Sequence, residues 1–265
     1  MGTMVDHPFG PPVPSVALSP NSLVFVVAQL RFPPVVSINE DGFVGPFQEL
    51  IRSEYPNLEK AVEAQITLSP DGVHRTEGGV LWKFSTSDSS WHVALTSSFV
   101  AVSTSAYSNR NEFLTRLDFV VSALEQWLRP RRATRFGVRY VDRLEGEDLD
   151  RLAEFVRAEV LGVSLIEPGN SGVLGHVLTE SVYRLDDLTL RARHGRLPAG
   201  TSLDPSVPST NGPSWVCDLD ASIDNIDFDR NELLRRAAGF GDVIYRYYRW
   251  AMTSEFIRTH GGDLG

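Results

Sequence analysis

Residues 135–144 read Arg135-Phe136-Gly137-Val138-Arg139-Tyr140-Val141-Asp142-Arg143-Leu144, and this stretch decides the fold because it has the pattern of a long β-strand. Side chains on a strand alternate between two faces. One face would carry Phe136, Val138, Tyr140, Asp142 and Leu144, and the other would carry Arg135, Gly137, Arg139, Val141 and Arg143. A row of arginines over an apolar face predicts either a binding surface or a sheet face stabilised by charge pairs.

The helices and strands predicted on either side of this stretch follow the same order twice. The first series runs strand 22–32, helix 43–55, strands 78–86, 91–96 and 99–107, and a long helix that Asn109 or Asn111 would cap and Pro130 would close. The second series runs strand 135–144, helix 147–161, strands 172–185, 187–197 and 214–223, and helix 229–257. We therefore predict an α+β fold, with duplicated β-α-β-β-β-α units forming one mostly antiparallel, curved sheet with helices packed on one face.

The chain organisation follows from the same reading. Residues 1–21 are rich in proline and predict a flexible arm, and residues 259–265 predict a short tail. Residues 22–258 predict a single α+β domain of two pseudo-repeats, 22–129 and 132–258. Two separate α+β domains are the alternative, and the short joint between the repeats argues against it.

The helix predicted at 229–257 has the strongest periodicity in the chain. Its core-facing stripe steps by three and four residues through Leu233, Ala237, Phe240, Ile244, Tyr247 and Ala251. Arg246 falls outside this stripe. Gly239 and Gly241 mark the position where we expect a bend.

The loop at 198–213 is unusual for a compact domain, since Pro, Ser, Thr and Gly dominate it and apolar residues are rare. Loops of this length are either functional or disordered, and the composition favours disorder.

Composition narrows the range of partners. The 265-residue chain has a net charge of −9, which disfavours binding to nucleic acid or to an anionic membrane. Cys217 is the only cysteine, so no internal disulfide can form, and its place in an alternating strand predicts a buried, unreactive side chain. No apolar run of membrane-spanning length and no signal peptide are recognisable, so we expect a cytoplasmic protein.

Motifs for catalysis or metal binding are not recognisable in the sequence. The six histidines form neither an i,i+4 pair nor a cluster with Cys217, and neither a Gly-x-Ser-x-Gly elbow nor a phosphate-binding loop is present. We therefore expect no metal, no cofactor and, on balance, no enzymatic activity. The stretch 245–250 (Tyr-Arg-Tyr-Tyr-Arg-Trp) mixes aromatic and basic residues, a composition that fits a protein interface better than nucleic-acid binding.

The candidate binding residues extend the arginine row to neighbouring strands. They are Arg135, Arg139, Arg143, His176, Arg191, Arg193, Asp218 and Asp220. If their strands are adjacent, arginines would face carboxylates across the sheet and stabilise a solvated face. The functional alternative is a polar groove that grips an acidic ligand or an acidic partner segment. Asp218 and Asp220 also suggest a catalytic carboxylate pair, but two positions on one strand do not flank a cleft.

Three of these segments resemble a family of uncharacterised bacterial and archaeal proteins of about this length, sporadic in its distribution. The matching features are Leu30-Arg31-Phe32-Pro33 at the end of the first strand, the Arg-x-Gly-x-Arg-Tyr-x-Asp-Arg pattern of residues 135–143, and the aromatic helix 240–256 with Thr253. The patchy distribution of that family implies a role beside mobile or defence-associated genes, and it implies no reaction.

The first functional hypothesis is a non-enzymatic binding or interaction protein, an accessory of a neighbouring gene product. We expect a protein partner, with a homodimer and a small acidic ligand as further candidates. The second hypothesis is a small-ligand sensor that uses the concave face of the sheet as its pocket. The third is an enzyme with an unrecognised site, which carboxylates of strongly perturbed pKa in a cleft would indicate.

Overall fold

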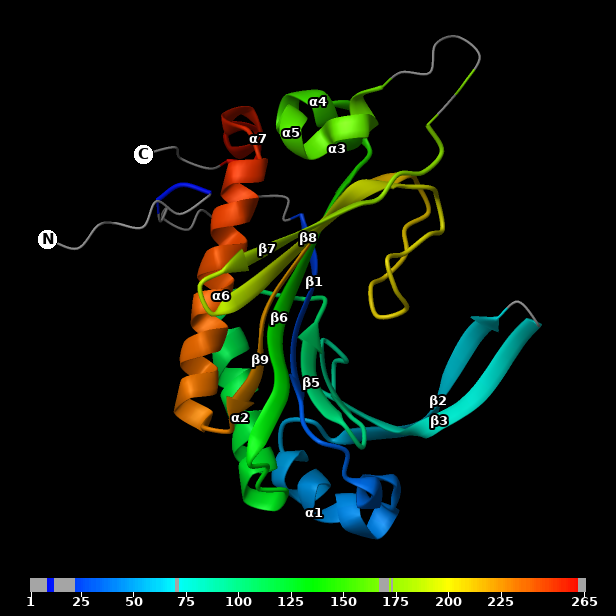
Figure 1. Cartoon of the computed structure of the whole chain (residues 1–265), viewed down its shortest axis with the longest axis vertical. Coiled ribbons are helices and arrows are strands. Elements are labelled where there is room, and N and C mark those ends of the chain that lie inside the picture. The colour runs from blue at the N-terminus through cyan, green and yellow to red at the C-terminus, as the bar shows by residue number, and fades with distance from the viewer. Residues whose placement is uncertain (1–8, 12–21, 70–71, 167–171, 173, 262–265) are drawn as a thin grey trace, which may run out of the picture. The chain divides into compact units, whose positions relative to one another are not determined.

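The fold is α+β, as predicted, with one open antiparallel sheet (Figure 1). The computed structural model describes residues 9–11, 22–69, 72–166, 172 and 174–261. Nine strands are hydrogen-bonded in the order β2-β3-β4-β5-β1-β6-β9-β8-β7. They are β1 Leu23–Arg31, β2 Asn57–Ser69, β3 Gly72–Ser85, β4 Trp91–Leu95, β5 Phe99–Thr104, β6 Arg132–Glu145, β7 Thr179–Leu185, β8 Leu188–Leu197 and β9 Ser214–Asp227.

The described residues also form seven α-helices and two short 3-10 helices. The α-helices are α1 Asp41–Ile51, α2 Arg110–Trp127, α3 Glu147–Asp150, α4 Leu152–Phe155, α5 Ala158–Leu161, α6 Arg230–Ala251 and α7 Ser254–Thr259. The 3-10 helices are η1 Val36–Asn39 and η2 Gly162–Leu165. None of the helices in the described ranges combines the length and the hydrophobicity that crossing a membrane would require.

The strand order bears on the predicted duplication. With β2 set aside, the order is β3-β4-β5-β1 followed by β6-β9-β8-β7, so equivalent strands of the two predicted repeats hold mirrored places. The prediction of three strands between the two helices of the first repeat is wrong, because β2 adds a fourth there and pairs antiparallel with β3. Its sequence is rich in Glu, Lys and Ala, and strand pairing outweighs that weak propensity. The duplication itself stays a prediction.

The chain forms two compact units that do not coincide with the predicted repeats. The first consists of residues 1–26, 139–222 and 239–265, and the second of residues 27–138 and 223–238. β1, β6, β9 and α6 each contribute residues to both units. The joint at 129–132, where the sequence places the repeat boundary, lies wholly within the second unit.

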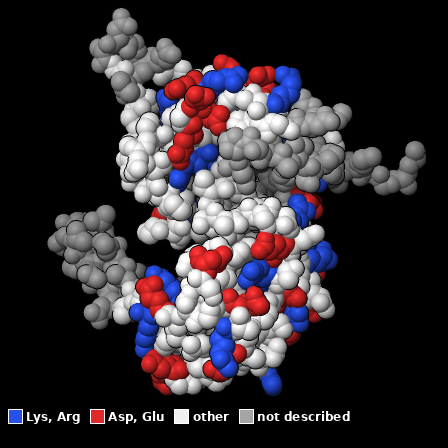
Figure 2. Space-filling model, turned by 180° about the vertical axis from the view of Figure 1, so that it is seen from behind, with Lys and Arg blue, Asp and Glu red and all other residues white. Residues whose placement is uncertain are grey.

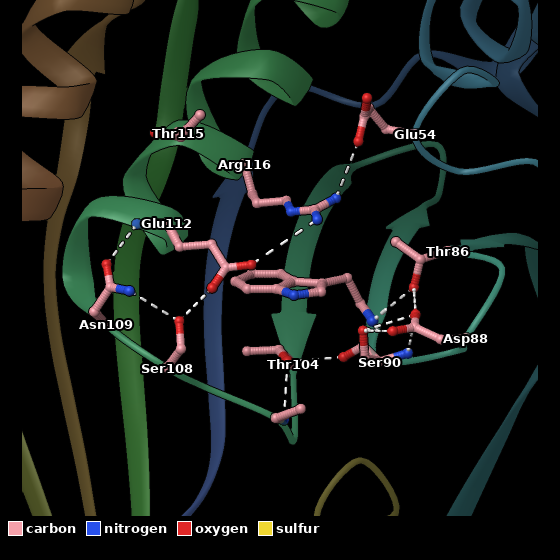
Figure 3. Close-up of polar contacts among 12 residues, drawn as sticks. Glu54, Thr86, Asp88, Ser90, Thr104, Ser108, Asn109, Glu112, Thr115 and Arg116 are labelled. Atoms are coloured by element: carbon pink, nitrogen blue, oxygen red, sulfur yellow. Dashed lines mark hydrogen bonds and ion pairs between the residues drawn. The ribbon is translucent and has the colours of Figure 1, made fainter.

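In the second unit, α2 begins at a side-chain cap, and of the two predicted candidates Asn109 and Asn111 it is Asn109 that provides it. The Asn109 Oδ1 atom accepts a hydrogen bond from the Glu112 backbone N–H at 3.0 Å. One turn further along, Arg116 forms ion pairs with Glu54 at 3.4 Å and with Glu112 at 3.9 Å. Figure 3 draws both contacts. In the turn between β3 and β4, hydrogen bonds from Thr86 and Ser90 hold the pKa of Asp88 at about 2. These contacts stabilise the turn and the first turns of α2, and we assign no binding site to them.

In the first unit, the predicted helix 229–257 is interrupted near its end. α6 continues unbroken through Gly239 and Gly241, where we expected a bend, and ends at Ala251. Met252 then pairs with Val156 in an isolated antiparallel bridge, and the Thr253 side chain caps α7. The same bridge explains why the predicted helix 147–161 is interrupted between α4 and α5, whereas α3 and α4 are separated at Arg151, whose backbone is not helical. The extended backbone of Val156 cannot continue a helix.

The core-facing stripe of α6 is confirmed. Phe240, Ile244, Tyr247 and Ala251 are each at most 1% exposed. Cys217 is fully buried on β9, as predicted, together with Trp215, Leu219 and Ala221. Arg246 is only partly exposed, because it lies in the wall of a pocket beside Trp250.

Candidate functional site

The centre of the predicted arginine row is a buried ion pair between β6 and β9. Arg139 donates from Nε to Asp218 Oδ1 at 2.7 Å and from Nη2 to Asp218 Oδ2 at 3.1 Å. The side chain of Asp218 is 1% exposed and that of Arg139 is 15% exposed. Arg193 stands opposite Asp218 in the β8–β9 register and contacts the same carboxylate through Nη2. Cross-strand charge pairing is therefore present among these three residues, but Asp218 is buried and does not lie on the solvated face that we expected.

The loop at 198–213, drawn in amber in Figure 1, covers this face of the sheet. Its Asp204 Oδ2 atom accepts a hydrogen bond from Arg139 Nη1 at 2.6 Å. Its Pro208 carbonyl accepts a hydrogen bond from Nη2 of Arg143, whose side chain is 5% exposed. The term arginine cluster is used below for Arg139, Arg143, Arg193, Asp204 and Asp218.

The structure gives the loop a defined path, although its composition favours disorder. Ser206 N–H donates to Asp204 Oδ1 at 2.9 Å, and Val207 N–H donates to the Asp204 carbonyl at 3.1 Å. Thr210 Oγ1 donates to Glu145 Oε2 at 2.8 Å and fastens the outgoing limb to β6. Val207 is 2% exposed, so the loop also has an apolar anchor. The composition did not reveal the contacts with Arg139, Arg143 and Glu145, because these partners are distant in the chain.

Charges in the arginine cluster are balanced locally. Burial by itself would raise the pKa of Asp204, but the charge and the hydrogen bond of Arg139 outweigh it and hold the pKa below its ordinary value. Arg143 Nη1 also lies 3.4 Å from Glu145 Oε1. The three guanidinium groups of Arg139, Arg143 and Arg193 therefore face the carboxylates of Asp204, Asp218 and Glu145.

The other predicted site residues lie outside this cluster. Arg191 stands opposite Asp220 in the register and forms a half-exposed ion pair with Glu180 at 3.7 Å. His176 is exposed and precedes β7, because that strand begins at Thr179 and not at the predicted residue 172. Arg135 belongs to the other compact unit and is half-buried there.

Asp204 and Pro208 were missed by sequence reasoning. Two signals could have found them. Asp204-Pro205-Ser206 has the composition of a tight turn, and the aliphatic residues Leu203 and Val207 flank it in an otherwise polar loop.

On the opposite face of β6, Asp142 is buried beneath α6. Ser22 Oγ donates to Asp142 Oδ1 at 2.8 Å, and the hydroxyl of Tyr248 lies 2.8 Å from Ser22 Oγ. Burial raises the pKa of Asp142 to about 7, while the hydrogen bond from Ser22 opposes the rise. Burial together with the charges of Asp142 and Asp218 also raises the pKa of Cys217 well above its ordinary value, so its thiol is no nucleophile near neutral pH.

We expect Asp142 to make the protein less stable as pH rises. The unfolded carboxyl titrates near pH 4, whereas the folded group titrates at about 7, so its contribution is complete at acid pH and lost as pH rises through 7. The free energy of unfolding should fall by about 2 kcal/mol between about pH 5 and pH 7 from this group alone. Urea unfolding of the protein and of its Asp142→Asn variant measures it, since the variant should lack this slope. Equal slopes would show that Asp142 is already ionised at pH 5.

Among the residues that the structure describes, no group of three or more His, Cys, Asp or Glu side chains is arranged to hold a metal ion. Comparison of the chain with protein-family models, curated proteins and solved structures gave no significant match. The resemblance of residues 135–143 to an uncharacterised family therefore stays a prediction that rests on its motifs.

Proposed function

We propose that the protein is a non-enzymatic binding protein, and that its arginine cluster binds an acidic segment of a partner protein in the place that Asp204 occupies in the closed loop. The observation that supports this is the Arg139–Asp204 contact of 2.6 Å. Asp218 already accepts hydrogen bonds from Nε and Nη2 of Arg139. The remaining Nη1 donates to Asp204, a carboxylate on a surface loop. An external carboxylate has the same chemistry as this internal one.

The loop has the features of a displaceable cover. Leu197 and Ser214 are paired across β8 and β9, so the loop can leave without separating these strands. The side chain of Asp204 is 30% exposed, so water reaches and partly screens its ion pair with Arg139. Val207 is the one buried apolar side chain of this fully described loop. Displacement would therefore cost the burial of one valine and the hydrogen bonds that Arg139 and Arg143 make with the loop, which an acidic partner segment would replace.

The test removes the cover and supplies the loop as a peptide. In one variant, Asn-Gly replaces residues 198–213 and joins β8 to β9 by a two-residue hairpin turn. The probe is a fluorescein-labelled peptide with the sequence of residues 202–208, Ser-Leu-Asp-Pro-Ser-Val-Pro. We expect this variant to bind the peptide at least about tenfold more tightly than the full chain, because the tethered loop competes at an effective concentration of about millimolar.

A second peptide with Asn in place of Asp isolates the carboxylate and should bind at least about tenfold more weakly. Asp204→Asn in the full chain keeps the loop and should increase peptide affinity, whereas Glu159→Gln removes the same charge elsewhere and should not. If the shortened chain does not fold, the comparison of Asp204→Asn with Glu159→Gln in the full chain tests the proposal. Equal binding of both peptides, or equal effects of both substitutions, would refute the proposal.

A further inference from the structure

A second candidate site lies on the first unit, away from the arginine cluster, at the carboxyl end of α6. It is a pocket of about 280 Å³, lined by Arg157, Arg246, Arg249, Trp250 and the segment 9–11. None of these residues belongs to the arginine cluster, so the inference does not depend on the proposed function. The pocket contains part of the basic and aromatic stretch 245–250, which the fold alone does not explain.

An aromatic wall gives the pocket its shape. The ring of Phe9 lies 4.7 Å from the ring of Tyr247 and 5.6 Å from that of Trp250, measured between centroids. It also meets Tyr183 edge to face at 5.1 Å, and it is 7% exposed. These contacts hold the segment 9–11 against α6 as a fixed side of the pocket. The pocket can therefore accept an apolar group as well as a polar one.

The charge of the pocket is positive, since the lining contains three arginines and no acidic residue. Arg157 donates from Nε to the Trp250 carbonyl at 2.5 Å, and its guanidinium carbon lies 5.9 Å from the centre of the indole ring. Arg157 makes no ion pair, and Arg246 makes neither an ion pair nor a side-chain hydrogen bond, within the part of the chain that the structure describes. Two guanidinium groups that form no ion pair with any described carboxylate thus meet in one concavity.

We infer that this pocket binds a small phosphate monoester whose organic part contains a flat apolar ring. A phosphate monoester carries close to two negative charges near neutral pH, which matches the two unneutralised guanidinium groups. Its oxygens accept paired hydrogen bonds from the planar guanidinium group. Trp250, which is partly exposed, supplies apolar surface for the ring, and Phe9 supports the indole from the buried side-chain cluster.

The field of the whole molecule does not favour anions, because the net charge is −9 and acidic and basic groups are interspersed on the face seen in Figure 2. Binding must therefore come from the local arginines.

The test is calorimetric titration of the full chain with phenyl phosphate, inorganic phosphate and phenol at about pH 7.5, where the monoester is a dianion. Phenyl phosphate should bind saturably and at least about tenfold more tightly than inorganic phosphate, because the ring buries apolar surface. Phenol should show no saturable binding. Absence of phenyl phosphate binding up to ~10 mM would refute the site.

Two matched substitutions locate the binding. Arg246→Gln removes a cation of the pocket and should weaken phenyl phosphate binding by at least about tenfold. Arg258→Gln removes the same charge from α7, outside the pocket lining, and should change the affinity by less than about twofold. Equal losses in both variants would show general attraction of anions and would overturn the inference. Equal affinities for phenyl phosphate and inorganic phosphate would overturn the part that concerns the ring.

Discussion

Replacing Gly195 by alanine should destabilise the protein by about 3 kcal/mol or more. Gly195 is a buried residue of β8, and the backbone of residues 177–178 crosses directly over it. An added Cβ atom would lie 1.8 Å from the Val177 carbonyl oxygen and 2.8 Å from the Leu178 Cα atom. Both are backbone atoms, and the hydrogen bond from Val177 N–H to the Arg196 carbonyl, 3.1 Å long, holds them in place. A flexible side chain could move aside, but this backbone cannot do so without losing that bond.

The matched control for this prediction is Gly175→Ala. Gly175 precedes the same crossing, and an added Cβ atom there would meet nothing within 4 Å. Urea unfolding of both variants gives the loss in stability, and limited proteolysis reports whether residues 174–178 have detached. Unchanged stability together with an unchanged cleavage pattern for Gly195→Ala would mean that the crossing is not as close as the structure places it.

Sequence patterns predicted the elements whose periodicity is set by burial. The stripe through Phe240 and Ile244 predicted α6, and Asn109 predicted the first turn of α2. Alternation on β9 correctly placed Cys217 on a buried face, although the opposite face, with Val216 and Asp218, is buried as well. In each case the information is local, because neighbouring residues along one element decide which side faces the core.

The elements that local patterns missed depend on distant partners. β2 is a strand because β3 offers it a pairing edge, and its own composition does not require it. The interruption after Ala251 depends on Val156, almost a hundred positions earlier in the chain, which pairs with Met252.

The candidate site shows the same division. Alternation placed Arg139 and Asp218 on polar faces of their strands, and the structure joins them. Alternation could not show that Asp204 and Pro208 would contact these arginines. The path of a loop is not encoded in a repeating sequence pattern. The pocket at Trp250 likewise combines segments from three parts of the chain.

Replacing Arg139 by alanine should cost about 3–5 kcal/mol of unfolding free energy, because it removes a partner of a buried charge. Asp218 is 1% exposed and would lose two hydrogen bonds of 2.7 and 3.1 Å. Burial opposes the charged form of Arg139, but the hydrogen bonds and charges of Asp218 and Asp204 outweigh it and raise its pKa, so the guanidinium group is firmly cationic. Arg193 would remain beside Asp218, which keeps the loss below that of a wholly unpaired carboxylate.

Arg191→Ala is the matched control on the same sheet face, since Arg191 stands opposite Asp220 but its side chain is 53% exposed. Exposed ion pairs contribute at most about 1 kcal/mol, so this variant should unfold close to the unchanged protein. A double-mutant cycle of Arg139→Ala with Asp218→Asn should then give a coupling energy of about 1.5–3 kcal/mol. A loss below 1 kcal/mol for Arg139→Ala would mean that the guanidinium group lies in solvent and that its ion pair with Asp218 does not stabilise the fold. The predicted size of the loss is also why Arg139 cannot itself test partner binding: that question belongs to Asp204, whose removal leaves the buried pair intact.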